Sequence, residues 1–235
     1  RLRYQADWDS LRTHRVPDWY RDAKLGAIIH WAPSSVPAWA PVEGDLTSHA
    51  RQKGFEYYFK HNPNTEWYQN TIRIDGSPSQ QYHRRPYGVQ AKYTDFAPIF
   101  RDAAEAWDPE SWAETLEMAG FRYVVFVAKH HDGFLLWPSD RPNPFIPDYH
   151  LERDAIGELA AAVRRRGIRF GLYYSGGLDW AWTDIPITDI ASMYRCIGQR
   201  PDFVDYVDGH WRELIDRFRP DLLWGDIGYP ASADV

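Results

Sequence analysis

Four short apolar runs divide the chain and predict the strands of a parallel sheet. They are residues 25–30 (LGAIIH), 123–128 (YVVFVA), 168–174 (IRFGLYY) and 222–226 (LLWGD). Their interiors are apolar without polar alternation, which is typical of strands that are covered on both faces of a parallel sheet.

Amphipathic segments precede three of these runs and predict helices. Before the second run, residues 108–109 (DP) offer an N-cap and a first-turn proline, and Gly120 ends the helix. Before the third, Asp154 caps a helix that Gly167 ends, and before the fourth, apolar residues recur at helical spacing over 207–218. Alternating strands and helices predict an α/β fold, either a doubly wound sheet or a (β/α)8 barrel. No G-x-G-x-x-G follows the first run, which disfavours a dinucleotide cofactor.

Length and composition narrow the class of protein. With 235 residues and 44% hydrophobic residues, we expect one large globular domain. The net charge of −6 disfavours a nucleic-acid partner, and no run approaches the ~18 apolar residues of a membrane span. The start, RLRYQADWDS, has no apolar signal-peptide core, which favours the cytoplasm and otherwise leaves the location unknown. Cys196 is the single cysteine, so no internal disulfide forms.

Aromatic residues are abundant, at 16% of the chain with 12 Trp and 15 Tyr. Rings with polar neighbours, such as Trp67 beside Glu66 and Trp224 before Gly225-Asp226, suit the apolar faces and hydroxyl rims of sugars. The competing interpretation, favoured by composition alone, is that these rings fill a large core. Residues 32–100 hold many of the prolines and aromatics and predict long ordered loops with short helices.

Each predicted strand ends in polar or aromatic residues. The first ends at His30, the second at 129–132 (KHHD), the third at 173–175 (YYS) and the fourth at Asp226. In (β/α)8 barrels the active site lies at the carboxyl ends of the strands, whereas the opposite face serves stability. All four predicted strands therefore point to one site at that end of a sheet.

His130 and His131 leave several roles open. Adjacent residues of an extended strand point to opposite faces, so we do not expect both to bind one metal ion unless the backbone turns. Two neutral imidazoles that reach different hydroxyls of one ligand fit better. The structural alternative is one satisfied core histidine and one that caps a loop, and a metal-dependent hydrolase built with Asp132 is a further reading.

Two carboxylates, Asp226 and Glu66, each have either a structural role or a role in a sugar-binding site. Asp226 follows an apolar strand and is either a turn residue or a nucleophile that attacks a sugar C1, as in retaining glycosidases. Glu66 either occupies the first turn of a helix after 62–63 (NP) or binds hydroxyls and handles protons in a site.

A series of motifs together resembles a known family. They are LGAIIHW, SVPAW, TEWY, YTDFAPIF, WDPESWAETLEMAGFRYVVFVAKHHDGFLLWPS, RFGLYYSGGLDW and PDLLWGD, over about residues 7 to 230. Their order is similar to that of the retaining α-L-fucosidases of glycoside hydrolase family 29. The KHHDGF-x-LW block and the strand-end aspartate are specific in combination, whereas each alone is weak.

The resemblance implies a (β/α)8-like catalytic domain, usually followed by a β-sandwich, that removes terminal α-L-fucose with retention and without a metal ion or cofactor. It implies that the substrate is a fucosylated oligosaccharide or glycoside. By position, Asp226 matches the family's nucleophile and Trp224 matches a residue of the pocket wall. Trp67 is a pocket candidate only because it stands beside Glu66. The matches to fucose-hydroxyl binders are His30, Glu66, His130, His131 and Tyr173.

The chain departs from this family in its length. A (β/α)8 barrel needs about 250 residues, yet the four predicted strands already extend to residue 226. We therefore expect residues 1–235 to be a partial catalytic domain with the first four strand–helix units. The second barrel half, the general acid/base and the β-sandwich are then expected elsewhere. A missing C-terminal portion or a partner copy in a homo-oligomer would cover the open sheet edge.

Two functions of different class follow from this expectation. One is an α-L-fucosidase that works by double displacement through Asp226. The other is a fucose-binding or catalytically incomplete fragment that keeps the hydroxyl-binding residues and lacks the acid.

Overall fold

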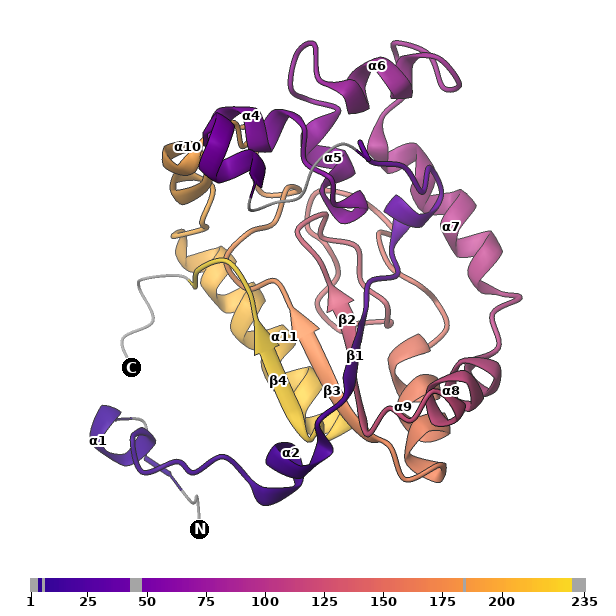
Figure 1. Cartoon of the computed structure of the whole chain (residues 1–235), viewed down its shortest axis with the longest axis vertical. Helices are drawn as coiled ribbons and strands as arrows, with labels where there is room; N and C mark the ends of the chain where they lie inside the picture. The colour runs from indigo at the N-terminus through magenta and orange to yellow at the C-terminus, as the bar shows by residue number, and fades with distance from the viewer. Residues whose placement is uncertain (1–3, 6, 43–47, 184, 230–235) are drawn as a thin grey trace.

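A four-stranded, all-parallel sheet forms the centre of the protein in a computed structural model that describes residues 4–5, 7–42, 48–183 and 185–229. The strands lie in the order β1-β2-β3-β4, which is also their order along the chain (Figure 1). Their bounds are β1 (Gly26–Ile29), β2 (Tyr123–Lys129), β3 (Arg169–Tyr174) and β4 (Leu222–Gly225). The predicted apolar runs are therefore confirmed as strands, with ends that differ by one or two residues.

A helix precedes each strand, as expected for right-handed parallel connections. These helices are α2 (Asp18–Ala23), α8 (Pro109–Met118), α9 (Ala155–Arg165) and α11 (Pro201–Phe218). The predicted caps are confirmed, because the side chains of Asp108 and Asp154 accept hydrogen bonds from the first turns of α8 and α9. Gly120 and Gly167, just beyond the ends of these helices, both have positive φ, which glycine adopts without strain.

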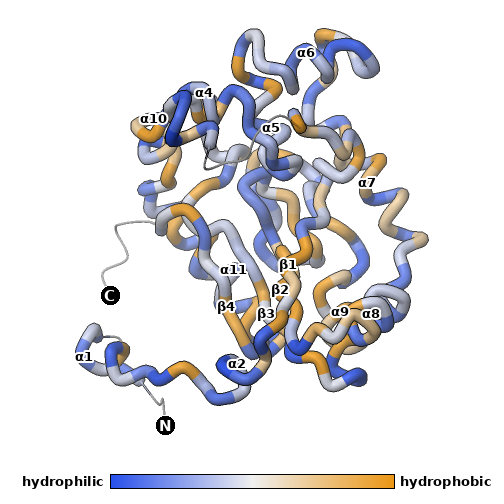
Figure 2. The backbone as a smooth tube through the Cα atoms, in the orientation of Figure 1, coloured by the Kyte–Doolittle hydropathy of each residue, from blue (hydrophilic) through white to orange (hydrophobic). Residues whose placement is uncertain are grey.

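The two faces of the sheet differ in what covers them. On one face Phe126, Phe170 and Leu172 are fully buried, and they belong to a large hydrophobic core that includes residues of α8, α9 and α11. On the other face Val125, Val127 and Tyr173 form a much smaller cluster. The strands are mostly coloured as hydrophobic in Figure 2, because both groups lie along them.

The expectation that all four strands are covered on both faces is wrong for the outer pair. β1 and β4 each have one neighbouring strand, so less of their surface is covered. Ile28 is 41% exposed, Leu223 45% and Trp224 41%. β2 and β3, which have a neighbour on each side, are almost completely buried.

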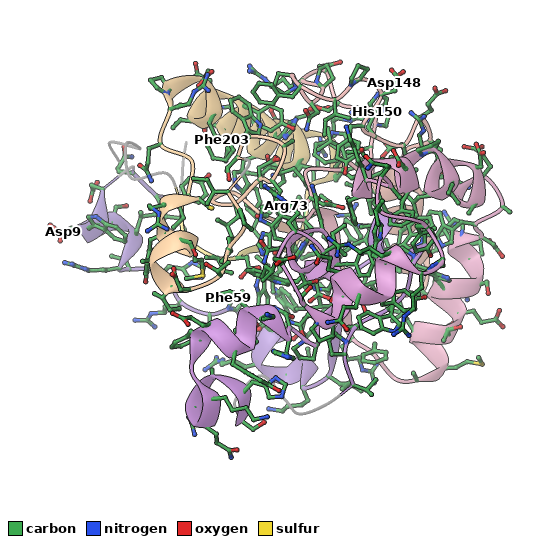
Figure 3. The ribbon with its side chains drawn as sticks, turned by 90° about the horizontal axis from the view of Figure 1, so that it is seen from above. Asp9, Phe59, Arg73, Asp148, His150 and Phe203 are labelled. Atoms are coloured by element: carbon green, nitrogen blue, oxygen red, sulfur yellow. The ribbon has the colours of Figure 1, made fainter. Side chains whose placement is uncertain are left out.

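The irregular region predicted for residues 32–100 consists of loops and short helices near the carboxyl ends of the strands (Figure 1). Its elements are η1 (Pro33–Ser35), η2 (His49–Lys53), α4 (Phe55–Lys60), η3 (Thr65–Trp67), α5 (Tyr68–Thr71), α6 (Pro78–Arg84), η4 (Tyr93–Asp95) and the start of α7 (Phe96–Ala104). α10 (Ile190–Arg195) lies near α4, whereas α1 (Trp8–Leu11), which carries Asp9, projects away from the body (Figures 1 and 3). Among the described residues no helix has the length and apolar character needed to cross a lipid bilayer.

Candidate functional site

Side chains from all four strand ends meet at one place beside the sheet. His30 follows β1, His130 follows β2 and Tyr173 lies near the end of β3. The ring centroids are 5.2 Å apart for His30 and His130, 5.5 Å for His30 and Tyr173, and 5.6 Å for His130 and Tyr173. Asp226, which follows β4, joins them through a hydrogen bond from Tyr173. The convergence expected from the strand ends is therefore present.

The backbone turns where β2 ends, which brings the two adjacent histidines together. The pairing register of β2 with β3 shifts between Val127 and Lys129, and the N–H of Gly133 donates to the carbonyl of His130 at 3.1 Å. The His130 and His131 ring centroids are only 4.0 Å apart. The sequence left open that a turn of the backbone would bring these side chains together, and this alternative holds, because the strand has already ended at Lys129 and its alternation no longer applies.

Two polar groups lie close to the Asp226 carboxylate. The Tyr173 hydroxyl donates to Oδ2 at 2.5 Å, and His131 Nε2 lies 3.5 Å from the same oxygen. Burial and the negative charge of Asp226 both raise the pKa of Tyr173. The hydroxyl therefore stays protonated and donates to the carboxylate. The Asp226 side chain is 33% exposed, so it remains open to a ligand.

Ser175 determines which nitrogen of His131 carries the proton. The Ser175 hydroxyl lies 2.7 Å from the carbonyl of Leu178, which only accepts, so the hydroxyl donates there. Its oxygen lies 2.6 Å from His131 Nδ1 and must accept from an Nδ1–H. Neutral His131 then presents an unprotonated Nε2, which has no hydrogen-bond partner, beside Asp226. Two acceptors facing one another are well placed to receive the proton of a ligand hydroxyl.

The three imidazoles of the site favour the neutral state. Burial lowers the pKa of His130 and His131 well below the ordinary value, and the nearby charges of Lys129 and the other histidines lower it further. Burial also lowers the pKa of His30, although the negative charges of Glu66 and Asp226 oppose this effect. Neutral imidazoles both accept and donate hydrogen bonds, which suits recognition of hydroxyl groups.

The remaining predicted residues surround this group. Glu66 and Trp67 lie on η3. A carboxylate oxygen of Glu66 and one ring nitrogen each of His30 and His130 lie within 4.8 Å of one another. The buried Trp67 ring packs edge-on against His131, with centroids 5.3 Å apart. Trp224 on β4 pairs in register with Tyr173, so its half-exposed side chain extends the same face of the sheet.

Within the described part of the chain, two groups of side chains have atoms close enough to hold a metal ion. They are His30, Glu66 and His130, and His130, His131 and Asp226. The hydrolase reading that uses Asp132 is wrong in its ligand set, because the buried Asp132 faces elsewhere. Its Oδ2 accepts from the Tyr93 hydroxyl at 2.7 Å, and its Oδ1 accepts from the N–H of Phe134 at 3.2 Å.

Sequence reasoning missed several residues that support the site. Lys129 Nζ and Asp179 Oδ2 form an ion pair at 2.8 Å between two fully buried side chains. Trp180 packs against the rings of both Trp67 and His131, at 5.5 and 5.4 Å. A lysine that ends an apolar run is a detectable signal for a buried counter-charge, but nothing in the sequence identifies Asp179 as its partner.

Comparison with known proteins gives a consistent result. The model of the family described as alpha-L-fucosidase matches residues 1–234. The human tissue alpha-L-fucosidase is 34% identical over 231 residues, which cover 95% of this chain and 42% of that protein. The alpha-L-fucosidase of Branchiostoma floridae is 33% identical and covers 97% and 45%, respectively. The chain therefore spans less than half the length of these relatives.

Solved structures agree in fold. The Thermotoga maritima alpha-L-fucosynthase in complex with α-L-Fuc-(1-2)-β-L-Fuc-N3 superposes with a TM-score of 0.88 at 41% identity. The match covers 97% of this chain and 51% of that one. The Thermotoga maritima alpha-fucosidase in complex with fucose superposes with a TM-score of 0.85, also at 41% identity, and the match covers 97% and 51%.

Proposed function

Because this chain belongs to the alpha-L-fucosidase family, we propose that the protein releases terminal α-L-fucose from fucosylated oligosaccharides or glycosides. The observation that carries this proposal is the placement of the Asp226 carboxylate. It stands at a strand end, receives a hydrogen bond from Tyr173 and faces an unprotonated His131 nitrogen. A carboxylate held among hydroxyl-binding groups suits attack on a sugar C1.

The fold proposed for the whole catalytic domain is a (β/α)8 barrel, of which β1 to β4 form the first half. Support comes from the strand order, from the helix before each strand and from the difference between the two faces. The small cluster of Val125, Val127 and Tyr173 then faces the barrel interior, where side chains of further strands would complete it. The same strands would cover Trp224, which lies on this face at the open edge.

In the proposed reaction Asp226 acts as the nucleophile of a retaining double displacement. Its carboxylate forms a bond to C1 while the bond from C1 to the aglycone oxygen breaks, and water then hydrolyses the fucosyl ester. A second carboxylic acid protonates the leaving oxygen and later deprotonates the water. Tyr173 positions Asp226, and it releases the carboxylate oxygen as charge moves toward C1.

The proposed sugar contacts follow from the hydrogen-bonding capacity of each group. His131 Nε2 and Glu66 accept from fucose hydroxyls, and His30 and His130 donate or accept as neutral imidazoles. Trp67 and Trp224 provide apolar walls suited to the C6 methyl group of fucose. No step of this scheme uses a metal ion.

The test replaces Asp226 with glycine in the complete protein. We expect turnover of an aryl α-L-fucoside to fall by several orders of magnitude, and external azide to restore part of it with formation of β-fucosyl azide. Azide enters from the face that the carboxylate used, which explains the inverted product. Turnover close to wild type in Asp226→Gly would contradict the nucleophile assignment. Fucose binding without any turnover in the wild type would support the alternative of a sugar-binding protein.

A further inference from the structure

The turn after β2 meets the condition under which two adjacent histidines can bind one metal ion. In an extended strand their side chains would diverge, whereas here the His130 and His131 ring centroids lie 4.0 Å apart. One ring nitrogen of each histidine and a carboxylate oxygen of Asp226 lie within 4.8 Å of one another. Zinc in open sites takes three such nitrogen and oxygen ligands and leaves its fourth position to water or substrate. The three side chains therefore match the ligand set of an open zinc site.

The distance between two of these ligand atoms fits tetrahedral zinc. Zn–N and Zn–O bonds of about 2.0–2.2 Å, at the tetrahedral angle, place two ligand atoms about 3.4 Å apart. His131 Nε2 and Asp226 Oδ2 lie 3.5 Å apart. The hydrogen bond from Tyr173 uses only one of the acceptor positions of Oδ2, so another remains for a cation.

His131 has the surroundings of a metal-binding histidine. Such a histidine nearly always donates its second ring N–H to a fixed acceptor, which sets the tautomer. The Ser175 oxygen, held by its hydrogen bond to the Leu178 carbonyl, accepts from Nδ1 at 2.6 Å. The fully buried Nε2 has no hydrogen-bond partner within the described part of the chain, and an unpaired buried nitrogen indicates a bound ligand. Asp226, whose side chain is 33% exposed, opens the site to solvent.

We propose that His130, His131 and Asp226 form an inhibitory binding site for Zn²⁺. An ion held there coordinates the carboxylate that attacks C1 in the proposed reaction, and it occupies the place where His131 would accept from a fucose hydroxyl. Zinc and substrate therefore exclude one another, and the ion takes no part in the chemistry. The inhibition rests on the proposed fucosidase function, whereas zinc binding itself does not.

Calorimetric titration of Zn²⁺ into the complete, metal-free protein tests the site independently of turnover. We expect a single tight binding event for Zn²⁺ and none for Mg²⁺, which prefers an octahedral set of oxygen ligands. Asp226→Asn removes an anionic ligand at nearly constant side-chain size, and Ser175→Ala removes the acceptor that orients His131. Each should weaken zinc binding by about tenfold or more, since loss of an outer-shell partner alone lowers metal affinity about 10- to 100-fold.

Two control variants locate the ion. Glu66→Gln makes the same change from carboxylate to amide in the other group of possible ligands, which contains His30 and His130, and should retain most of the affinity. His14→Gln removes an exposed histidine outside both groups and should leave the affinity unchanged.

Steady-state kinetics of the wild type test the consequence for turnover. With an aryl α-L-fucoside as substrate, Zn²⁺ should raise KM in proportion to its concentration while kcat stays unchanged, and a chelator should reverse the effect. Absence of zinc binding, an affinity that survives Asp226→Asn, an affinity lost in Glu66→Gln instead, or inhibition that lowers kcat alone would overturn the site. Site-specific zinc binding by a protein that hydrolyses no α-L-fucoside in metal-free buffer would support the site and count against the proposed function.

Discussion

Replacement of Ser175 by alanine should damage the site through His131 without removing any group that touches the sugar. In the wild type the Ser175 hydroxyl links His131 Nδ1 at 2.6 Å to the carbonyl of Leu178 at 2.7 Å, in a fully buried setting. Alanine leaves both groups unpaired. Neutral His131 can then move its proton to Nε2 and donate to Asp226, 3.5 Å away. That tautomer removes the acceptor for the ligand hydroxyl and restrains the carboxylate.

The magnitude follows from the hydrogen bonds that are lost. Leaving a buried donor or acceptor unpaired costs about 1–3 kcal/mol. If the wild-type tautomer is favoured by that amount, kcat/KM for an aryl α-L-fucoside falls about 5- to 150-fold, since ~1.4 kcal/mol corresponds to a factor of ten. We expect KM to rise because a ground-state contact is lost, and kcat to fall because Asp226 is restrained. Unfolding in urea measures the accompanying loss of stability separately.

Two further variants separate this mechanism from a general packing defect. Ser175→Thr keeps the hydroxyl and should recover most of the activity. Ser139→Ala removes another part-buried hydroxyl, which donates to Glu213 on α11, and should leave kcat/KM unchanged. Wild-type kinetics in a folded Ser175→Ala protein, or equal losses in the alanine and threonine variants, would refute the reasoning.

Three other predictions concern groups around the site. Tyr173→Phe removes the hydrogen bond to Asp226, so kcat/KM should fall about 10- to 100-fold while the free energy of unfolding in urea stays unchanged. A variant as active as the wild type would show that this contact is dispensable. Lys129→Met leaves the buried Asp179 without its counter-charge, which should lower the free energy of unfolding in urea by about 3–5 kcal/mol. The double variant Lys129→Met/Asp179→Leu should recover part of this loss, and no recovery would contradict the pairing of the two side chains. Burial raises the pKa of Asp132 to about 6, so its contribution to stability is full below about pH 4 and is lost as the pH rises through 6. The wild type should therefore lose on the order of 3 kcal/mol relative to Asp132→Asn between pH 4 and 7, and a pH-independent difference would argue against the shift.

The sequence predicted the strands and their helices because both depend on local patterns. The apolar runs ending at His30 and Asp226 stand out from polar surroundings, and Asp154 and Gly167 mark a helix at both ends. The convergence of the strand ends followed from the parallel arrangement alone. The roles proposed for the site residues stay predictions.

What sequence could not supply depends on contacts between distant segments. Nothing around Lys129 indicates that its partner is Asp179, fifty residues further along the chain, or that Trp180 packs against His131. The turn after β2 stayed an open alternative, because the polar residues 129–132 (KHHD) fit either the last residues of a strand or a turn that follows it. Composition favoured core packing for the aromatics, and Trp31 is an example, since its ring packs against Trp107, Trp112 and Phe126.

The identity of the nucleophile is the central claim, and a mechanism-based label tests it most directly. The protein is incubated with 2-deoxy-2-fluoro-α-L-fucosyl fluoride, whose leaving group needs little acid assistance, and its peptides are analysed by mass spectrometry. The fluorine slows hydrolysis of the ester, so the covalent intermediate accumulates. The account predicts a 2-fluorofucosyl increment on the peptide that contains Asp226, absent in Asp226→Gly. Labelling of a different carboxylate, or no labelling of a folded protein that hydrolyses α-L-fucosides, would contradict it.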